Sequence, residues 1–185
     1  MFQFESKKKM MAAALLSGLF FQSCKHDDDH DHNHENELIT TVKIHLVPPG
    51  GGMVMATWKD LTPNEPSGVM VDSLLLDSGV NYTGRIELLD ETVSPAKDRT
   101  AEVKAEADEH LFVYKQIPAN SALLNIGITD TDSKGRPLGI TFTLKGEKKG
   151  AAVLRAILRH QPGTKDGTEG PGDTDVDVQI PFKVK

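Results

Sequence analysis

The sequence predicts an all-β domain: an antiparallel β-sandwich of the immunoglobulin-like or Greek-key type, with about nine strands and one short helix. Apolar and polar residues alternate along many short segments, which is typical of half-buried strands. Turn-forming residues separate these segments at roughly the 8–12-residue spacing of sandwiches, and one segment has a helical composition. The domain is expected over residues 38–185, after a leader at 1–23 and a linker at 24–37.

The clearest strand pattern is the C-terminal TDVDVQIPFKVK, in which every second residue from Val176 to Val184 is apolar. Pro181 cannot donate to a neighbouring strand, so an edge or a bulge is expected near it. The acidic residues Asp173, Asp175 and Asp177 are expected to form the solvated face. The other expected strands are 39–47, 53–58, 69–76, 82–89, 111–117, 122–129, 140–145 and 151–160. The last of these also fits a helix by composition, but its place between two strand-like segments favours a strand.

One helix is expected within residues 94–109, because this segment is rich in helix-forming residues and Pro95 follows a candidate capping residue, Ser94. Glycine- and proline-rich turns are expected between the strands. The segment DTDSKG (130–135) is similar to the start of a calcium-binding loop, but Lys134 stands where an oxygen ligand is needed. It therefore predicts a hairpin turn.

The leader is predicted to be a lipoprotein signal peptide. Lys7, Lys8 and Lys9 precede a largely apolar run of twelve residues at 10–21, whereas a membrane-spanning helix needs about 20. Residues 21–24 (FQSC) resemble a bacterial lipobox, which implies cleavage before Cys24 and attachment of acyl chains to it. Cys24 is the only cysteine in the chain, so no disulfide can form. Acylated Cys24 is expected to anchor the protein to a membrane.

The charge balance excludes one class of partner. Without residues 1–23 the chain has 18 basic and 26 acidic residues, a net charge of −8. Nucleic acids bind basic surfaces, so no nucleic-acid partner is expected.

The linker predicts a metal-binding segment. Residues 25–37 contain no apolar side chain and are expected to be a disordered tether. Imidazole and carboxylate groups bind divalent transition metals, of which zinc is expected first and Cu²⁺ or Ni²⁺ are the alternatives. The expected ligands are His26, His30, His32, His34, Asp27, Asp28, Asp29 and Asp31. The alternative interpretation is an acidic spacer.

The remaining histidines, His45, His110 and His160, are scattered along the sequence. His45 is expected on the outward face of its strand. All three are interpreted as surface or hydrogen-bonded structural residues.

Four segments, ENELITTVKIHLVPPGGG, NYTGRIELLDET, AEADEHLFVY and RHQPG, resemble a family of small Gram-negative bacterial lipoproteins. Members are often labelled "type 1 periplasmic binding fold superfamily protein". That fold alternates strands with helices, whereas this sequence predicts one helix, so the sandwich is retained. The resemblance implies an outer-membrane lipoprotein, accessory to a TonB-dependent uptake receptor. The lysine and acids of CKHDDD are similar to an export signal for the outer face of that membrane.

The leading functional hypothesis is therefore a lipid-anchored outer-membrane protein whose tether captures a divalent transition metal, zinc first, for a transporter. The alternative is a non-catalytic surface lipoprotein whose sandwich binds a protein, a glycan or a small solute, with the tether as spacer. The sequence contains no nucleophile elbow, phosphate-binding glycine loop or HExxH motif, so no enzymatic activity is expected.

Overall fold

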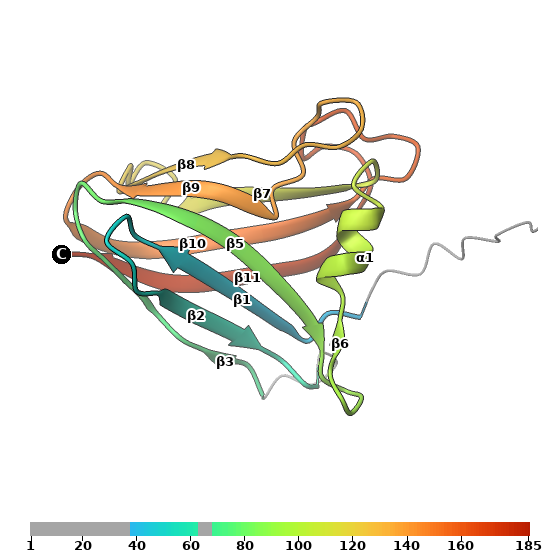
Figure 1. Ribbon diagram of the computed structural model, residues 1–185, viewed down its shortest axis with the longest axis horizontal. Helices are drawn as coiled ribbons and strands as arrows, with labels where there is room; N and C mark the ends of the chain where they lie inside the picture. The colour runs from blue at the N-terminus through green and yellow to red at the C-terminus, as the bar shows by residue number, and fades with distance from the viewer. Residues whose placement is uncertain (1–37, 63–67) are drawn as a thin grey trace, which may run out of the picture. The chain divides into compact units, whose positions relative to one another are not determined.

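The computed structural model describes residues 38–62 and 68–185, and these form two packed β-sheets with one short helix (Figure 1). The predicted all-β sandwich is confirmed. The described residues contain eleven strands, more than the nine expected, because several are only two or three residues long.

The larger sheet has seven strands, with the spatial order β3-β2-β1-β5-β9-β8 and β6 paired to β5. These strands are β3 (Met70–Val71), β2 (Val54–Lys59), β1 (Thr41–Val47), β5 (Asn81–Asp90), β9 (Thr141–Gly146), β8 (Leu124–Ile128) and β6 (Lys97–Asp98). The smaller sheet has the order β4-β11-β10-β7, made of β4 (Leu74–Leu76), β11 (Asp173–Val184), β10 (Gly150–His160) and β7 (His110–Ile117). All strand pairs in these two sheets are antiparallel except β4 with β11, which is parallel.

The single strand expected at 69–76 is divided between the two sheets. Asp72 exchanges hydrogen bonds with Thr57 of β2, through both its backbone amide and its carboxylate. Beyond this point the chain leaves β2, and Leu74 pairs with Phe182 in the other sheet. The apolar pattern predicted the strand residues but not the crossing between sheets.

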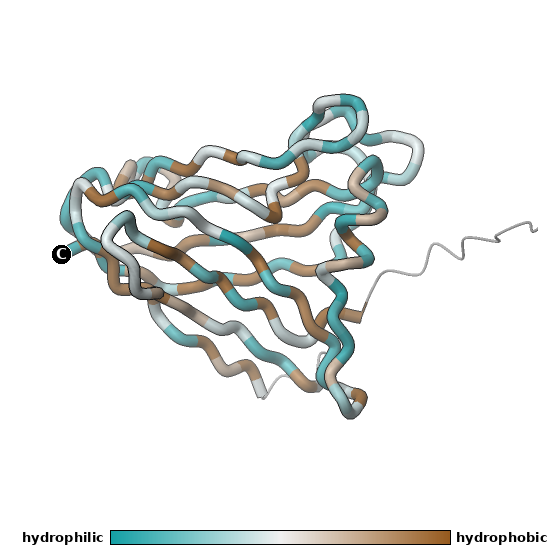
Figure 2. Tube along the Cα trace, in the orientation of Figure 1, coloured by the Kyte–Doolittle hydropathy of each residue, from teal (hydrophilic) through white to brown (hydrophobic). Residues whose placement is uncertain are grey.

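The core lies between the inward faces of the two sheets. Figure 2 shows hydrophobic and hydrophilic residues alternating along the strands. The inward residues of β1 and β11 are buried almost completely: Val42, Ile44, Leu46, Val176, Val178, Ile180, Phe182 and Val184. Burial of each such side chain stabilises the fold by about 1.5–3 kcal/mol. Pro181 precedes the three residues of β11 that pair with β4, so β11 is an edge strand up to this position.

The helix α1 (Thr100–Ala105) lies within the predicted segment but begins later than Ser94. The carboxylate of Asp98 accepts a hydrogen bond from the amide of Thr100 at 2.8 Å, so the predicted cap at Ser94 is wrong. The Thr100 hydroxyl in turn accepts a bond from the amide of Leu88, and Val103 is fully buried. These contacts hold α1 against the end of β5 (Figure 1).

Gly84 of β5 provides a test of core packing. A Cβ at this position would lie 2.4 Å from the ring of Phe142, which is fully buried. Alanine normally stabilises a strand relative to glycine, but here Gly84→Ala is expected to lower the free energy of unfolding by about 1–3 kcal/mol because of overpacking. Urea unfolding measures the change. Gly50→Ala, with no atom within 4 Å of its Cβ, is the control and is expected to change stability by less than about 0.5 kcal/mol. A stabilised Gly84→Ala protein would contradict this packing.

Candidate metal centre

A β-bulge in β11 changes the direction of one acidic side chain. In the pairing with β10, Val176 lies opposite Leu158 and Thr174 lies opposite Arg159, so Asp175 is the extra residue. Bulges interrupt the alternation of faces and redirect side chains. The side chain of Asp175 is fully buried, and its predicted place on the solvated face is wrong. Asp177 does lie on that face, where it pairs with Arg155.

His110 and His160 meet beside this bulge. They lie opposite each other in the pairing of β7 with β10, on the same inward face as Phe112 and Leu158. Their rings stack with a centroid distance of 4.7 Å and an interplanar angle of 6°. His110 is fully buried and His160 is 7% exposed. Two histidines that are fifty residues apart in the sequence, and were expected to be scattered, are thus neighbours in the fold.

The three side chains form a compact donor set, the His110–His160–Asp175 cluster. Nε2 of His110 lies 3.5 Å from Oδ2 of Asp175, and Nδ1 of His160 lies 4.0 Å from Oδ1. The ligand atoms of all three residues lie within 4.8 Å of one another. Glu109 adds a second carboxylate, 3.7 Å from Nε2 of His160.

The contact made by Nδ1 of His110 shows which ring nitrogen donates a hydrogen bond. Nδ1 lies 3.2 Å from the backbone carbonyl of Glu106, which can only accept a hydrogen bond. Nδ1 therefore carries a proton and donates to this carbonyl, and Nε2 is the nitrogen that faces Asp175. A carbonyl that orients a histidine in this way is typical of metal sites.

The carboxylate of Asp175 is buried without a compensating hydrogen bond from the described residues. Both carboxylate oxygens are buried, and neither has a hydrogen-bond partner among the described residues. A buried, poorly solvated carboxylate is costly unless a cation compensates it. Ligands of a tetrahedral zinc ion lie about 3.3 Å apart, since each bond is about 2.0–2.1 Å long. The observed separations of 3.5 and 4.0 Å are close to this value, so a small movement would bring the cluster around an ion.

A buried ionic network holds the two chain segments that carry the histidines. The ammonium of Lys165 donates to the carbonyl of Ala107 at 2.7 Å and lies 3.1 Å from the carboxylate of Asp132. Arg136 donates to the same carboxylate and to the carbonyl of Asp108. Ala107 and Asp108 lead directly into His110, and Lys165 follows His160 by five residues. The network therefore restrains the backbone on both sides of the cluster.

Charge pairing explains why these groups remain ionised. Burial alone would raise the pKa of Asp132, but hydrogen bonds from the Arg136 amide and from the side chains of Lys165 and Arg136 hold it far below its usual value. Burial lowers the pKa of Lys165, and the Asp132 carboxylate opposes this effect. The turn predicted at 130–135 is present, because Asp132 accepts hydrogen bonds from the amides of Lys134 and Arg136.

The expected tether ligands and lipid site lie outside the described residues: Cys24, His26, His30, His32, His34, Asp27, Asp28, Asp29 and Asp31. Among the residues that the structure describes, no helix is both long and apolar enough to cross a membrane. Sequence reasoning missed the cluster because its histidines have no ligand spacing. The one available signal was that AEADEHLFVY and RHQPG, two of the segments that carry the family resemblance, each contain one of them.

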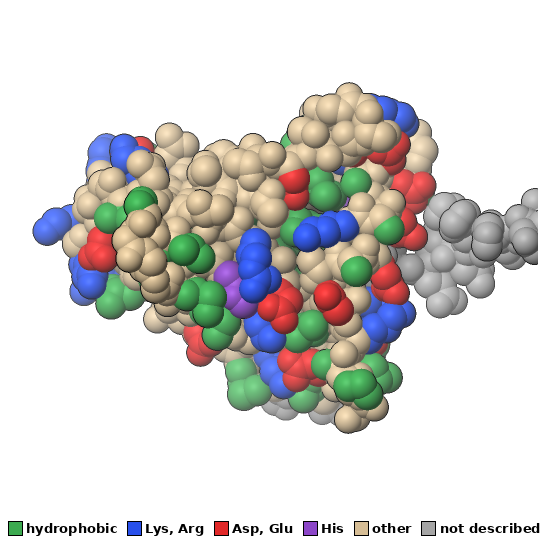
Figure 3. Space-filling model, viewed as in Figure 1, with side chains coloured by type: hydrophobic (Ala, Val, Ile, Leu, Met, Phe, Trp, Pro, Cys, Tyr) green, Lys and Arg blue, Asp and Glu red, His purple; other side chains and the backbone are tan. Residues whose placement is uncertain are grey.

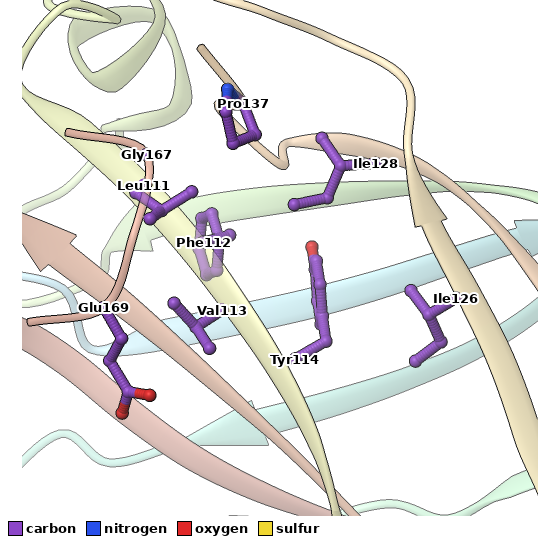
Figure 4. A pocket seen from close by; sticks show the side chains of 9 residues that line it. All are labelled: Leu111, Phe112, Val113, Tyr114, Ile126, Ile128, Pro137, Gly167 and Glu169. Atoms are coloured by element: carbon purple, nitrogen blue, oxygen red, sulfur yellow. The ribbon is translucent and has the colours of Figure 1, made fainter.

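A separate apolar hollow of about 280 Å³ lies where the edges of the two sheets face each other, between β7 and β8 (Figure 4). Phe112 and Tyr114 line one side, and Ile126 and Ile128 line the other. The Tyr114 hydroxyl donates to the carbonyl of Gly139 at 2.5 Å, and burial raises its pKa well above the usual value. No buried polar side-chain atom of the described lining residues is without a hydrogen-bond partner. The hollow therefore offers fewer polar groups that could select a particular ligand than the His110–His160–Asp175 cluster does.

Comparison with protein-family models gives no match, and comparisons with curated proteins and with solved structures give none either.

Asp132→Asn is expected to lower the free energy of unfolding by about 3–5 kcal/mol at pH 7, because it leaves Lys165 buried without its carboxylate. The pKa of Asp132 is lower in the folded than in the unfolded protein, so its contribution is complete above the unfolded value of about 4 and is lost as the pH falls below it. Urea unfolding at several pH values should show the difference between wild type and variant shrinking below pH 4. Asp177→Asn, which disrupts an exposed ion pair, should cost no more than about 1 kcal/mol. Equal effects of the two substitutions would refute the role of burial.

Proposed function

We propose that this protein is a lipid-anchored outer-membrane protein that captures a divalent transition metal, zinc first, as an accessory to a TonB-dependent uptake receptor. The observation that carries the metal-binding part is the buried carboxylate of Asp175, which lies beside His110 and His160 and has no hydrogen-bond partner within residues 38–62 and 68–185. Two imidazoles and one carboxylate are the donor set of many zinc sites that keep a position open for another ligand. An exchangeable position suits a protein that takes up metal and passes it on.

The tether and the cluster have complementary properties in this proposal. Side chains of a disordered segment must be ordered upon binding, which reduces affinity. The cluster is held by two neighbouring strand pairs, so less ordering is needed and tighter binding is expected. The tether would collect metal ions quickly and weakly, while the cluster would retain one ion.

Charge supports a cationic ligand. The chain beyond residue 23 has a net charge of −8, which raises the local concentration of cations. Near the cluster, Asp175 and Glu109 both lie within 4.0 Å of a histidine nitrogen. This negative surrounding favours a divalent ion over a neutral solute.

The alternative function is binding of a protein, a glycan or a small solute by the sandwich, with the tether as a spacer. The hollow between β7 and β8 favours this alternative, since it is apolar and open at the edge of the sandwich. Its lining has no unsatisfied polar group among the described residues to select a ligand. We therefore rank it second.

Zinc titration tests the cluster. In calorimetry on the chain beyond residue 23 carrying Cys24→Ala, one zinc ion should bind more tightly than the rest, and Asp175→Asn should weaken it by at least about tenfold, or 1.4 kcal/mol. At zinc concentrations about 100 times Kd, binding should stabilise the protein by about 2.7 kcal/mol, measured as a rise in Tm. Without metal, Asp175→Asn should be at least as stable as wild type, since a buried amide costs less than an unpaired carboxylate.

The matched control is Asp177→Asn, which removes a neighbouring but exposed carboxylate and should not change zinc affinity. Deleting residues 25–37 should remove the weaker zinc sites and leave the tight one. Equal zinc binding by wild type and Asp175→Asn would exclude the cluster, and equal binding with and without 25–37 would exclude the tether.

The lipid anchor is tested separately. Cys24→Ala should abolish acylation, because no other cysteine can accept the lipid, and the protein should leave the membrane fraction. Mass spectrometry of the protein purified from membranes should show an acylated residue 24 at the amino terminus. Unchanged membrane partitioning of Cys24→Ala, or an intact leader without lipid, would disprove the anchor.

A further inference from the structure

His45 has an unusual environment on the outer face of the seven-stranded sheet. It points outward as predicted, in register with Met55 of β2 on one side and Arg85 of β5 on the other. Yet only 6% of its surface is exposed. Figure 3 views this face and shows a histidine flanked by basic, acidic and hydrophobic side chains. An outward histidine that is covered in this way needs partners for both ring nitrogens.

Within the described part of the chain, only one of those nitrogens has a hydrogen-bond partner. Nε2 lies 2.8 Å from the carboxylate of Glu87. Burial would raise the pKa of Glu87, but hydrogen bonds from Lys43 and His45 outweigh it and hold the pKa below its usual value. The ionised carboxylate accepts the Nε2 proton, which leaves the lone pair on Nδ1 in the neutral ring. Nδ1 is buried and has no hydrogen-bond partner among the described residues.

Two methionines lie on the same outer face of the sheet as His45. Met53 and Met55 are two residues apart along the extended segment at the start of β2, so they share a face, and Met55 is directly opposite His45. Their exposed fractions are 59% and 44%, which is high for an apolar side chain. His45 and Met53 line the same small hollow, of about 200 Å³, together with Val47. His45 Nδ1, which has no hydrogen-bond partner among the described residues, thus belongs to a side chain that shares a hollow with Met53 and is paired in register with Met55.

We propose that His45, Met53 and Met55 bind one Cu(I) ion through Nδ1 and the two Sδ atoms. Thioether sulfur is a soft ligand that selects Cu(I), and imidazole also binds copper well. The carboxylate of Glu87 on the opposite ring nitrogen is the orienting contact that metal-bound histidines use. The long, unbranched methionine side chains can turn inward to close the site, since they are exposed and flexible.

The surrounding charges favour a monovalent ion. All three proposed ligands are neutral. The charged groups that face His45 are Glu87, Lys43 and Arg85, whose charges sum to +1, with Lys43 and Arg85 lying 3.1 and 3.7 Å from the Glu87 carboxylate. A divalent ion would receive no negative ligand here and would be repelled more strongly than Cu(I). This site therefore differs in chemistry from the His110–His160–Asp175 cluster and does not depend on it.

The test is anaerobic titration of the full chain, carrying Cys24→Ser to remove the thiol, with Cu(I) in competition with a chromophoric Cu(I) chelator. The double substitution Met53→Leu/Met55→Leu should remove one bound Cu(I) or weaken it at least about tenfold. Methionine and leucine have similar volumes, so folding should be preserved. His45→Gln should have the same effect. X-ray absorption of the Cu(I) complex should show sulfur neighbours that the double substitution removes.

Met70→Leu is the matched control. Met70 is 60% exposed and lies opposite Lys59 of β2. Lys59 is four residues beyond Met55 on that strand, which places Lys59 about 13 Å from Met55. It should leave Cu(I) binding unchanged. Equal Cu(I) binding by the parent and the Met53/Met55 double variant, or an equal loss in Met70→Leu, would overturn the proposal. Zinc binding should be unaffected by the methionine substitutions, and Cu(I) binding at this site should survive His110→Gln/His160→Gln, so the two proposals fail separately.

Discussion

The pairing of β10 with β11 is the constraint on which the rest of this structure depends. These two long strands form one side of the core. Their buried inward residues are Leu154, Ala156, Leu158, Val176, Val178 and Ile180. The alternation is interrupted at one point, between Leu158 and Arg159. A one-residue bulge there costs little pairing but turns a carboxylate inward, next to two histidines. The bulge that interrupts the inward row of apolar residues is therefore also the feature that brings Asp175 next to His110 and His160.

Buried charged groups help to hold the end of the sandwich that carries the cluster. Asp132 and Lys165 have fully buried side chains, and both are satisfied by hydrogen bonds from or to the surrounding loops. Asp175, equally buried, lacks such bonds among the described residues. Buried polar groups are normally hydrogen-bonded, so this difference between the two carboxylates is the observation on which the proposed metal site rests.

The two proposed metal sites differ in the softness of their ligands and in the charge of their surroundings. The cluster combines imidazoles with carboxylates in acidic surroundings, which suits a divalent borderline ion such as zinc. The site at His45 combines imidazole with thioethers beside Lys43 and Arg85, which suits Cu(I). The same sheet architecture produces both, because a strand pair presents one inward and one outward row of side chains.

The sequence by itself determined the class of fold, most strand positions, the location of the helix and the turn at 130–135, because these follow from local periodicity and turn-forming residues. Periodicity also indicated that His45 points outward. Only the tertiary structure decided that His110 meets His160, that Asp175 leaves the solvated face, that β4 joins β11 in parallel, and that His45 is covered. Register and bulges arise from pairing between segments far apart in the chain, and a one-residue shift reverses every face. A pattern read along one strand shows which residues share a face, but not which residues of another strand they oppose or where a bulge falls.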